Sequence, residues 1–275
     1  MSTVSKALSE TQPRLLGAND PAPVLLAERT GPGPLVFCCD HAGALVPQML
    51  GTLGLGPEAL NDHIGVDIGI YAVTSWLSAL FDAPFVAQPY SRLVIDCNRR
   101  FGVPSSIPEV SDARAIPGNQ SLSEEARASR RDEILAPYQS ALATTLRAQE
   151  QRQGRPAILM AMHSFTRRMM SGTQRTVDIG VIHDGPSPLG DALRAALGGS
   201  GLNVQRNEPY CVGLEQDFTI PEHGIKAGRP YLEIEICQDL IGDCAGQRRL
   251  AGIMQGALRT ALDQVARDIE AETVQ

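Results

Sequence analysis

Residues 157–168, AILMAMHSFTRR, contain the element that decides the fold. The apolar run from Ala157 to Met162 follows Pro156 and ends in polar residues, which is typical of a buried strand. Its carboxyl end delivers His163 and Ser164, followed by two arginines. In an open α/β sheet, ligands bind beyond the carboxyl ends of the strands. We therefore expect His163 to face a crevice.

Three other stretches repeat this order of an apolar strand followed by reactive side chains. They are LVFCCDHAG (35–43), SRLVIDCNRR (91–100) and RPYLEIEICQDL (229–240). Further strands are expected at 84–88, 177–184 and 203–210, and helices at 66–81, 121–153, 188–197 and 247–271. Strands that alternate with helices indicate a sheet sandwiched between helical layers. We expect an α/β protein with a three-layer αβα architecture and a mainly parallel (mixed) central sheet.

Local signals refine two of these helices. Apolar residues recur at steps of three and four along 66–81, the period of one buried helical face. Ser121 and Glu124 have the spacing of a capping box at the start of the next helix, and Pro137 should kink or divide that helix. The long irregular stretch 101–120 is expected to be a loop that is either functional or disordered.

Composition limits the class of protein. A chain of 275 residues with 43 % hydrophobic and 20 % charged residues suits one globular domain, expected at 21–275 after a poorly ordered segment at 1–20. The net charge of -7 comes from interspersed acids and bases, so nucleic acid is not an expected partner. The absence of an apolar signal or membrane-spanning segment predicts a cytoplasmic protein. Six cysteines without a CxxC pair are expected to be buried free thiols.

Two histidines that follow predicted strands, His41 and His163, suggest a metal site. Zinc binds imidazole nitrogen and carboxylate oxygen, and a catalytic zinc keeps one position open. The carboxylate could come from Asp40, Asp67 or Asp96. Asp40 should point away from His41 because neighbouring strand residues face opposite sides, and Asp96 is better placed to orient an arginine.

Asp67 is the third candidate carboxylate, and it lies close to His63 in the sequence. They lie four residues apart and would share one face at the start of the predicted helix 66–81. An acid at that position could equally interact with the helix dipole.

Anion-binding and acid-base groups follow two other strands. Arg92, Asn98 and Arg99 surround the end of 91–97, where guanidinium and amide groups can bind a carboxylate or an oxyanion. Glu233 and Glu235 lie two apart, on one face of an apolar strand, where carboxylates are costly unless paired or used. We expect Glu235 to be a general base and Glu233 to pair with an arginine.

Other polar residues are candidates for substrate contacts. One of Arg167 and Arg168 is expected to face the crevice. His223 precedes the last strand and is either a substrate contact or a surface residue, and His183 is given no role.

An ordered set of segments resembles the N-formylglutamate amidohydrolase family, within the wider group of zinc exopeptidase-like hydrolases. The segments are 40–43 (DHAG), 63–69 (HIGVDIG), 90–99 (YSRLVIDCNR), 107–109 (IPE), 116–119 (IPGN), 163–166 (HSFT) and 235–240 (EICQDL). They span most of the chain. The resemblance implies a zinc exopeptidase/phosphorylase-hydrolase-like fold.

The resemblance also implies a set of roles. His41 and His163 would bind one divalent metal, expected to be Zn²⁺, and Glu235, Arg92 and Arg99 would act in catalysis. The resemblance makes Asn98 an anion binder together with Arg92 and Arg99, and we also expect Ser164, Arg168 and His223 to contact the substrate. The zinc carboxypeptidase ligand motif His-x-x-Glu is absent after His41. The carboxylate ligand must then come from elsewhere, and we expect Asp67, with His63 in reserve.

The activity that this resemblance implies is hydrolysis of an N-acyl amino acid. N-formyl-L-glutamate, cleaved to glutamate and formate in histidine catabolism, is the expected substrate. Two alternatives remain: a deacylase or carboxypeptidase acting on another acidic amide, and a non-catalytic domain that binds a small acidic ligand. The oligomeric state does not follow from the sequence.

Overall fold

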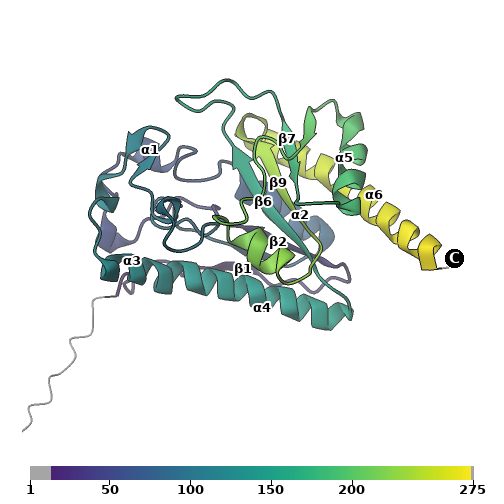
Figure 1. The fold of residues 1–275 in the computed structure, drawn as a ribbon, viewed down its shortest axis with the longest axis horizontal. Helices are drawn as coiled ribbons and strands as arrows, with labels where there is room; N and C mark the ends of the chain where they lie inside the picture. Colours follow the sequence, from purple (N-terminus) through teal and green to yellow (C-terminus); the bar gives the residue numbers. More distant parts are fainter. Residues whose placement is uncertain (1–13, 274–275) are drawn as a thin grey trace, which may run out of the picture.

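The computed structural model describes residues 14–273 and contains a seven-stranded mixed sheet between helical layers (Figure 1). The sheet order is β1-β3-β2-β6-β9-β7-β8. The strands are β1 (Leu25–Ala27), β2 (Leu35–Cys39), β3 (Phe85–Ala87), β6 (Ile158–Phe165), β7 (Ile179–Ile182), β8 (Val204–Arg206) and β9 (Tyr231–Cys237). The pairs β1/β3 and β7/β9 are antiparallel and the other four are parallel. The expected three-layer α/β fold is confirmed.

The helices cover both faces of this sheet. The longer ones are α2 (Ile70–Phe81), α3 (Glu124–Arg130), α4 (Ala136–Gln153), α5 (Pro188–Leu197) and α6 (Cys244–Thr273). A short α1 (Pro57–Leu60) and a hairpin of β4 (Val110–Ser111) and β5 (Arg114–Ala115) lie in the connecting segments. No helix within residues 14–273 is both long and apolar enough to cross a bilayer.

Alternation along β2 explains the layers. Leu35, Phe37 and Cys39 pack in the cluster that contains buried residues of α2, α5 and α6, whereas Val36 and Cys38 pack in the cluster of α4. Successive strand residues point to opposite faces, so a fully apolar strand requires helices on both sides. Figure 1 shows α4 running along one side of the sheet and α6 extending beyond it on the other.

Two helices begin later than their sequence patterns predict. The helix expected at 66–81 begins at Ile70, because Gly69 has a left-handed φ of 78° and interrupts the helical backbone. Asp67 therefore lies in a turn, and the expectation that it shares a helical face with His63 is wrong. Ser121 also has a positive φ of 52°, and the helix is capped instead by Ser123, whose Oγ accepts from Ala126 N at 3.2 Å.

Pro137 was expected to kink or divide the helix that follows this cap; it instead follows a π-helical turn in a helix that continues without a break. Pro137 lies in the first turn of α4, after the π-helical turn at Arg131–Leu135 that joins α3 to α4. Proline suits a first turn because its missing N–H would be unpaired there in any case.

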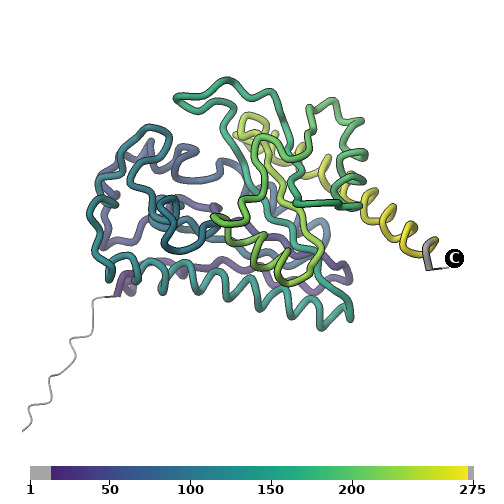
Figure 2. The backbone as a smooth tube through the Cα atoms, viewed as in Figure 1, coloured from purple at the N-terminus to yellow at the C-terminus, as the bar shows by residue number. Residues whose placement is uncertain are grey.

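The segment 91–97 is not the strand that its apolar run suggests. It is a buried series of turns in which Val94 N donates to Ser91 O and Asp96 N donates to Ser106 O. An apolar run shows burial but does not distinguish a strand from an irregular core segment. Figure 2 shows the irregular blue segments between α2 and α3 gathered on one side of the sheet.

A poorly ordered segment was expected at 1–20. Residues 1–13 of it lie outside the described residues. Residues 14–20 pack against the domain. Leu15 is buried, and the backbone N–H groups of Leu15 and Leu16 donate to the Glu133 carboxylate at 2.7 and 3.0 Å. This segment therefore belongs to the α/β domain.

Arg130 is one of the side chains that hold the turns at 91–99 in place, together with Asn119 and Gln139, and its replacement tests this. Its buried Nη1 donates to Val94 O at 2.9 Å and to Asn119 Oδ1 at 2.7 Å. Arg130→Met should lower the free energy of unfolding by about 3 kcal/mol, because buried acceptors lose their donors. The matched exposed change Arg147→Met should alter it by less than about 0.5 kcal/mol. Denaturant unfolding followed by circular dichroism measures both; equal effects would contradict the assignment.

Candidate metal centre and active site

A cavity of about 1540 Å³ opens beyond the carboxyl end of β6. Its lining includes 163–166 at the end of β6, Glu233 and Glu235 on β9, the turn at Asp96–Arg99, and the loop 210–217. The parallel pairing of β6 and β9 places His163 level with Glu235. The imidazole of His163 and the carboxylate of Glu235 therefore lie side by side in one wall of the cavity.

His41, Asp67 and His163 form a buried cluster at this wall. One possible ligand atom from each lies within 4.8 Å of the other two. Nδ1 of His163 lies 2.9 Å and Nδ1 of His41 lies 3.4 Å from the same oxygen, Asp67 Oδ2. Two imidazoles and a carboxylate are a common donor set for a catalytic zinc. These three residues fit a divalent metal.

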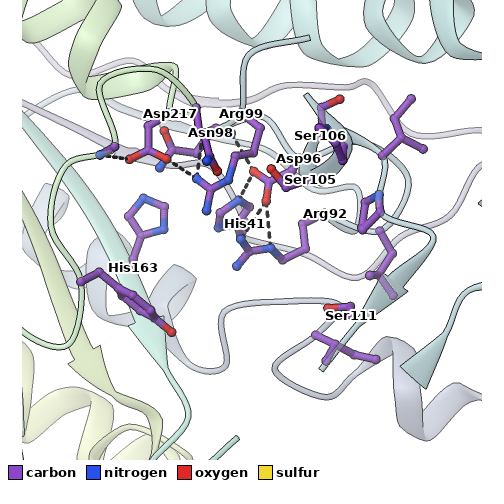
Figure 3. Close-up of a pocket in the computed structure, with 18 of the residues that line it drawn as sticks. His41, Arg92, Asp96, Asn98, Arg99, Ser105, Ser106, Ser111, His163 and Asp217 are labelled. Carbon is purple, nitrogen blue, oxygen red and sulfur yellow. Dashed lines mark hydrogen bonds and ion pairs between the residues drawn. The ribbon is translucent and has the colours of Figure 1, made fainter. Parts of the chain in front are cut away.

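The second nitrogen of each histidine faces another carboxylate. His41 Nε2 lies 2.7 Å from Asp96 Oδ1, and His163 Nε2 lies 3.1 Å from Asp40 Oδ2. Figure 3 shows His41 beside Asp96 and Arg92, and the His163 ring lies next to His41 with 5.0 Å between the ring centroids. A carboxylate behind a metal-binding histidine fixes the ring and its tautomer, which favours metal binding by the other nitrogen.

Charges within the cluster are strongly coupled. Burial alone would raise the pKa of Asp67, but His41 and His163 lower it far below its usual value. Burial would lower the pKa of His163, but Asp40 and Asp67 raise it well above its usual value. In the absence of a cation, a proton on His163 thus offsets the buried carboxylates.

Glu235 projects into the cavity without a fixed partner. Its Oε2 is buried and has no hydrogen-bond partner among the described residues. Burial raises the pKa of Glu235 to about 8; His163 opposes this shift, and Asp67 and Glu233 add to it. Glu235 is therefore able to exchange a proton near neutral pH.

Arg92 and Arg99 also line the cavity, each in an ion pair. Arg92 donates from Nε and Nη2 to Asp96 Oδ2 at 3.1 and 2.7 Å and from Nη1 to Asp67 Oδ1 at 3.3 Å. Arg99 Nη1 donates to Asp217 Oδ1 at 2.5 Å. Nε and Nη2 of Arg99 have no partner within residues 14–273, so this guanidinium can still bind a carboxylate.

Of the predicted substrate contacts, Asn98 and Ser164 line the cavity and Arg168 and His223 do not. Ser164 N donates to Asp67 Oδ2 at 3.2 Å and its Oγ donates to Ile68 O at 2.9 Å, which holds the Asp67 turn against β6. Arg168 is exposed, and His223 is buried with Nε2 2.7 Å from Gln139 Oε1. The structure does not bring these last two residues to the site.

His63, the reserve ligand, lines another part of the cavity. Its Nδ1 lies 2.8 Å from Asp62 Oδ1 and its Nε2 lies 3.0 Å from Asp112 Oδ2. Both ring nitrogens therefore have carboxylate partners away from the His41 cluster. Among the four residues weighed as the third ligand, Asp67 is the one placed between the two histidines.

Sequence reasoning missed the roles of Asp40 and Asp217. Cys38 pairs with Ala161, so Asp40 and His163, each two residues further along, share one face of neighbouring strands. The alternation rule places Asp40 away from His41 but does not indicate its approach to the next strand. Asp217 lies in a loop, and no sequence pattern indicates its pairing with Arg99. The expected arginine partner of Glu233 is also absent from the described ion pairs.

A mixed α/β sheet with a buried His–Asp–His cluster and an unpartnered glutamate defines a hydrolase with a candidate metal centre. The sequence model of N-formylglutamate amidohydrolase matches residues 33–242. The chain belongs to the N-formylglutamate amidohydrolase family, and it is a hydrolase that acts on amides.

Two solved structures are similar along almost their whole length. Gene product Atu2144 from Agrobacterium tumefaciens has 34% sequence identity and a TM-score of 0.85, covering 92% of this chain and 100% of its own. N-formylglutamate amidohydrolase from Ralstonia eutropha JMP134 has 22% identity and a TM-score of 0.68, covering 90% and 99%, and shares the fold. No curated protein matches the chain.

Gly180 allows the wall segment around Glu208 to pack beside Glu235, which predicts a steric effect. A Cβ at Gly180 would lie 1.9 Å from Glu208 O and 3.3 Å from Glu235 Cβ. Gly180→Ala should lower the free energy of unfolding by about 1–3 kcal/mol, because the backbone must shift. At Gly33 a Cβ would meet nothing within 4 Å, so Gly33→Ala is the control. Thermal unfolding compares them, and an unaffected Gly180 variant would refute the close approach.

Proposed function

We propose that this protein uses one divalent metal, Zn²⁺, to hydrolyse an N-acyl amino acid to the free amino acid and a carboxylate. The observation that carries the proposal is the convergence of two buried Nδ1 atoms on one oxygen of Asp67, beside the buried Glu235. The family name supplies N-formyl-L-glutamate as the first substrate to assay. That reaction gives glutamate and formate, a cytoplasmic step expected in histidine catabolism.

His41, Asp67 and His163 would hold the metal. Asp96 and Asp40 would keep the two imidazole rings oriented, and Arg92 would hold Asp67 and Asp96 together through its three donor atoms. Bound Zn²⁺ would polarise the acyl oxygen and lower the pKa values of water and of the nearby Glu235.

Glu235 moves the proton in this proposal. Its carboxylate takes a proton from the attacking water as the new C–O bond forms, and delivers it to the amide nitrogen as the C–N bond breaks. The second proton of the water passes to the same nitrogen, so the acyl group leaves as a carboxylate and the amino acid leaves with an ammonium group, and atoms and charges balance. Nε and Nη2 of Arg99 bind the carboxylate of the amino acid and fix the amide against Glu235.

A second candidate is hydrolysis of a larger substrate, such as an N-acyl amino acid with a long acyl group or a short peptide. The cavity volume of about 1540 Å³ favours it. Ligand pockets for drug-sized molecules are roughly 300–1,000 Å³, so this cavity exceeds what a formylated amino acid fills. A panel of N-formyl, N-acetyl and N-succinyl amino acids with short peptides separates the two.

The identity of the third ligand predicts a contrast in metal content. Asp67→Asn should lower metal content at least about tenfold, because the anionic donor between the two imidazoles is lost. His63→Ala should leave metal content unchanged, since both nitrogens of His63 face other carboxylates. Mass spectrometry of the metal in protein purified without chelator measures this. The reverse pattern would assign the ligand to His63.

The proton-transfer role of Glu235 predicts a loss of turnover without loss of metal. Glu235→Gln should lower kcat for the best substrate of the panel at least about a hundredfold, since general-base catalysis contributes that much. Metal content should stay the same because Glu235 lies outside the ligand cluster. Near-normal kcat in a metal-loaded Glu235→Gln protein would remove Glu235 from the mechanism.

A further inference from the structure

We propose that a buried chain of hydrogen bonds behind the candidate metal centre positions the metal ligand His163. Going outward from His163, its members are Asp40, Thr219, Gln139 and His223. The inference rests on the proposed metal-dependent function, and it gives a role to three buried polar residues that the reaction itself does not use. These three residues do not line the cavity, so they are positioning residues that act through Asp40.

Asp40 is the described partner of the outer nitrogen of His163. His163 Nε2 lies 3.1 Å from Asp40 Oδ2, and neither atom has another hydrogen-bond partner among residues 14–273. The other oxygen, Asp40 Oδ1, accepts a hydrogen bond from Thr219 Oγ1 at 2.6 Å. Asp40 and Thr219 are both buried. The hydroxyl of Thr219 therefore fixes the plane of the carboxylate that faces the His163 ring.

The backbone at Thr219 is anchored to the turn that carries Asn98. Phe218 N donates to Asn98 O at 3.2 Å, and Thr219 N donates to Asn98 Oδ1 at 3.1 Å. Thr219 thus keeps a fixed position beside Asp40, although the two residues are far apart in the sequence.

The amide of Gln139 determines the direction of the hydrogen bonds. Gln139 Nε2 lies 2.6 Å from Cys97 O, which can only accept, so this atom carries the amide hydrogens. The same Nε2 lies 3.2 Å from Thr219 Oγ1 and donates its second hydrogen there. Because Oγ1 accepts from Gln139, its own hydrogen is left for Asp40 Oδ1. Each donor in the series therefore points toward Asp40.

His223 holds the oxygen end of the Gln139 amide. His223 Nε2 lies 2.7 Å from Gln139 Oε1. Burial lowers the pKa of His223, so its ring is neutral and carries one N–H. Because Gln139 Oε1 can only accept, that hydrogen lies on Nε2. His223, which sequence reasoning placed at the substrate or on the surface, is the buried end of the chain.

The chain affects the metal centre through the orientation of one imidazole. A fixed Asp40 carboxylate favours the His163 tautomer whose Nδ1 faces Asp67 Oδ2, where a metal would bind. Without the Thr219 hydroxyl, a buried oxygen of Asp40 loses its donor, and the carboxylate is free to turn away from His163. Partners behind a metal ligand typically contribute roughly 10- to 100-fold to metal affinity.

The experiment measures the Zn²⁺ affinity of the 275-residue protein, prepared metal-free and titrated in competition with a chromophoric chelator. Thr219→Val keeps the shape of the side chain and removes the hydroxyl, so it should weaken Zn²⁺ binding at least about tenfold. Thr219→Ser keeps the hydroxyl and should retain most of the affinity. If Thr219 only filled space, valine would be the milder replacement and serine the more harmful one.

Two glutamines of α4 provide a matched control for the next member of the chain. Gln139 and Gln149 are both buried, and each donates to a backbone carbonyl, Gln139 to Cys97 O and Gln149 to Gly33 O. Gln139→Met should weaken Zn²⁺ binding, by a smaller factor than Thr219→Val because the Thr219 hydroxyl remains. Gln149→Met should lower the melting temperature to a similar extent and leave the Zn²⁺ affinity unchanged.

The outcomes separate the chain from the proposed function. Equal Zn²⁺ affinities of wild type and Thr219→Val would overturn the chain, and so would weaker binding by Thr219→Ser than by Thr219→Val. Equal losses in Gln139→Met and Gln149→Met would also overturn it, and this pair decides if Thr219→Val does not fold. A wild type that binds no Zn²⁺ would overturn the proposed function as well, whereas bound Zn²⁺ with unaffected variants overturns the chain alone.

Discussion

One oxygen of a buried carboxylate, Asp67 Oδ2, organises the site. It lies within hydrogen-bonding distance of His41 Nδ1, His163 Nδ1 and the backbone N–H of Ser164. These groups come from the end of β2 and from β6, which are far apart in sequence. A buried carboxylate requires such partners, since an unpaired charge in the interior costs several kcal/mol. The turn that precedes α2 is thereby held against the carboxyl ends of β2 and β6.

The register of the central strands brings the catalytic candidates together beside Asp67. Because β6 pairs with both β2 and β9, Asp40, His163 and Glu235 share one face at neighbouring positions. A slip of one residue in either pairing would move a side chain to the opposite face, into the apolar cluster around α6. The packing of Met160 and Met162 on that opposite face thus also fixes the groups that carry the chemistry.

The sequence predicts the layers of the fold well because they follow from local periodicity. Steps of three and four residues identify α2, and apolar runs identify β2, β6 and β9. The same local signal fails at 91–97, whose apolar residues pack against one face of the sheet and α4 without joining a strand. Helix starts at Ile70 and Glu124 depend on backbone conformations at Gly69 and Ser121 that composition alone does not reveal.

The sequence predicts those residues of the candidate site that directly follow an apolar run. His41, His163, Glu235 and the arginines at 92 and 99 follow apolar runs and meet in one cavity. Asp40, Asp217 and the unpaired state of Glu233 depend on which strands are neighbours and on how a distant loop folds back. Those relations are long-range, so no window of the sequence contains them.

Nine carboxyl side chains and three guanidinium groups line the cavity, and this imbalance matters for the products of amide hydrolysis. Every amide hydrolysis generates a carboxylate from the acyl half, whatever the acyl group. A small anion formed among fixed negative charges is repelled toward bulk water, and this repulsion weakens as dissolved salt screens it.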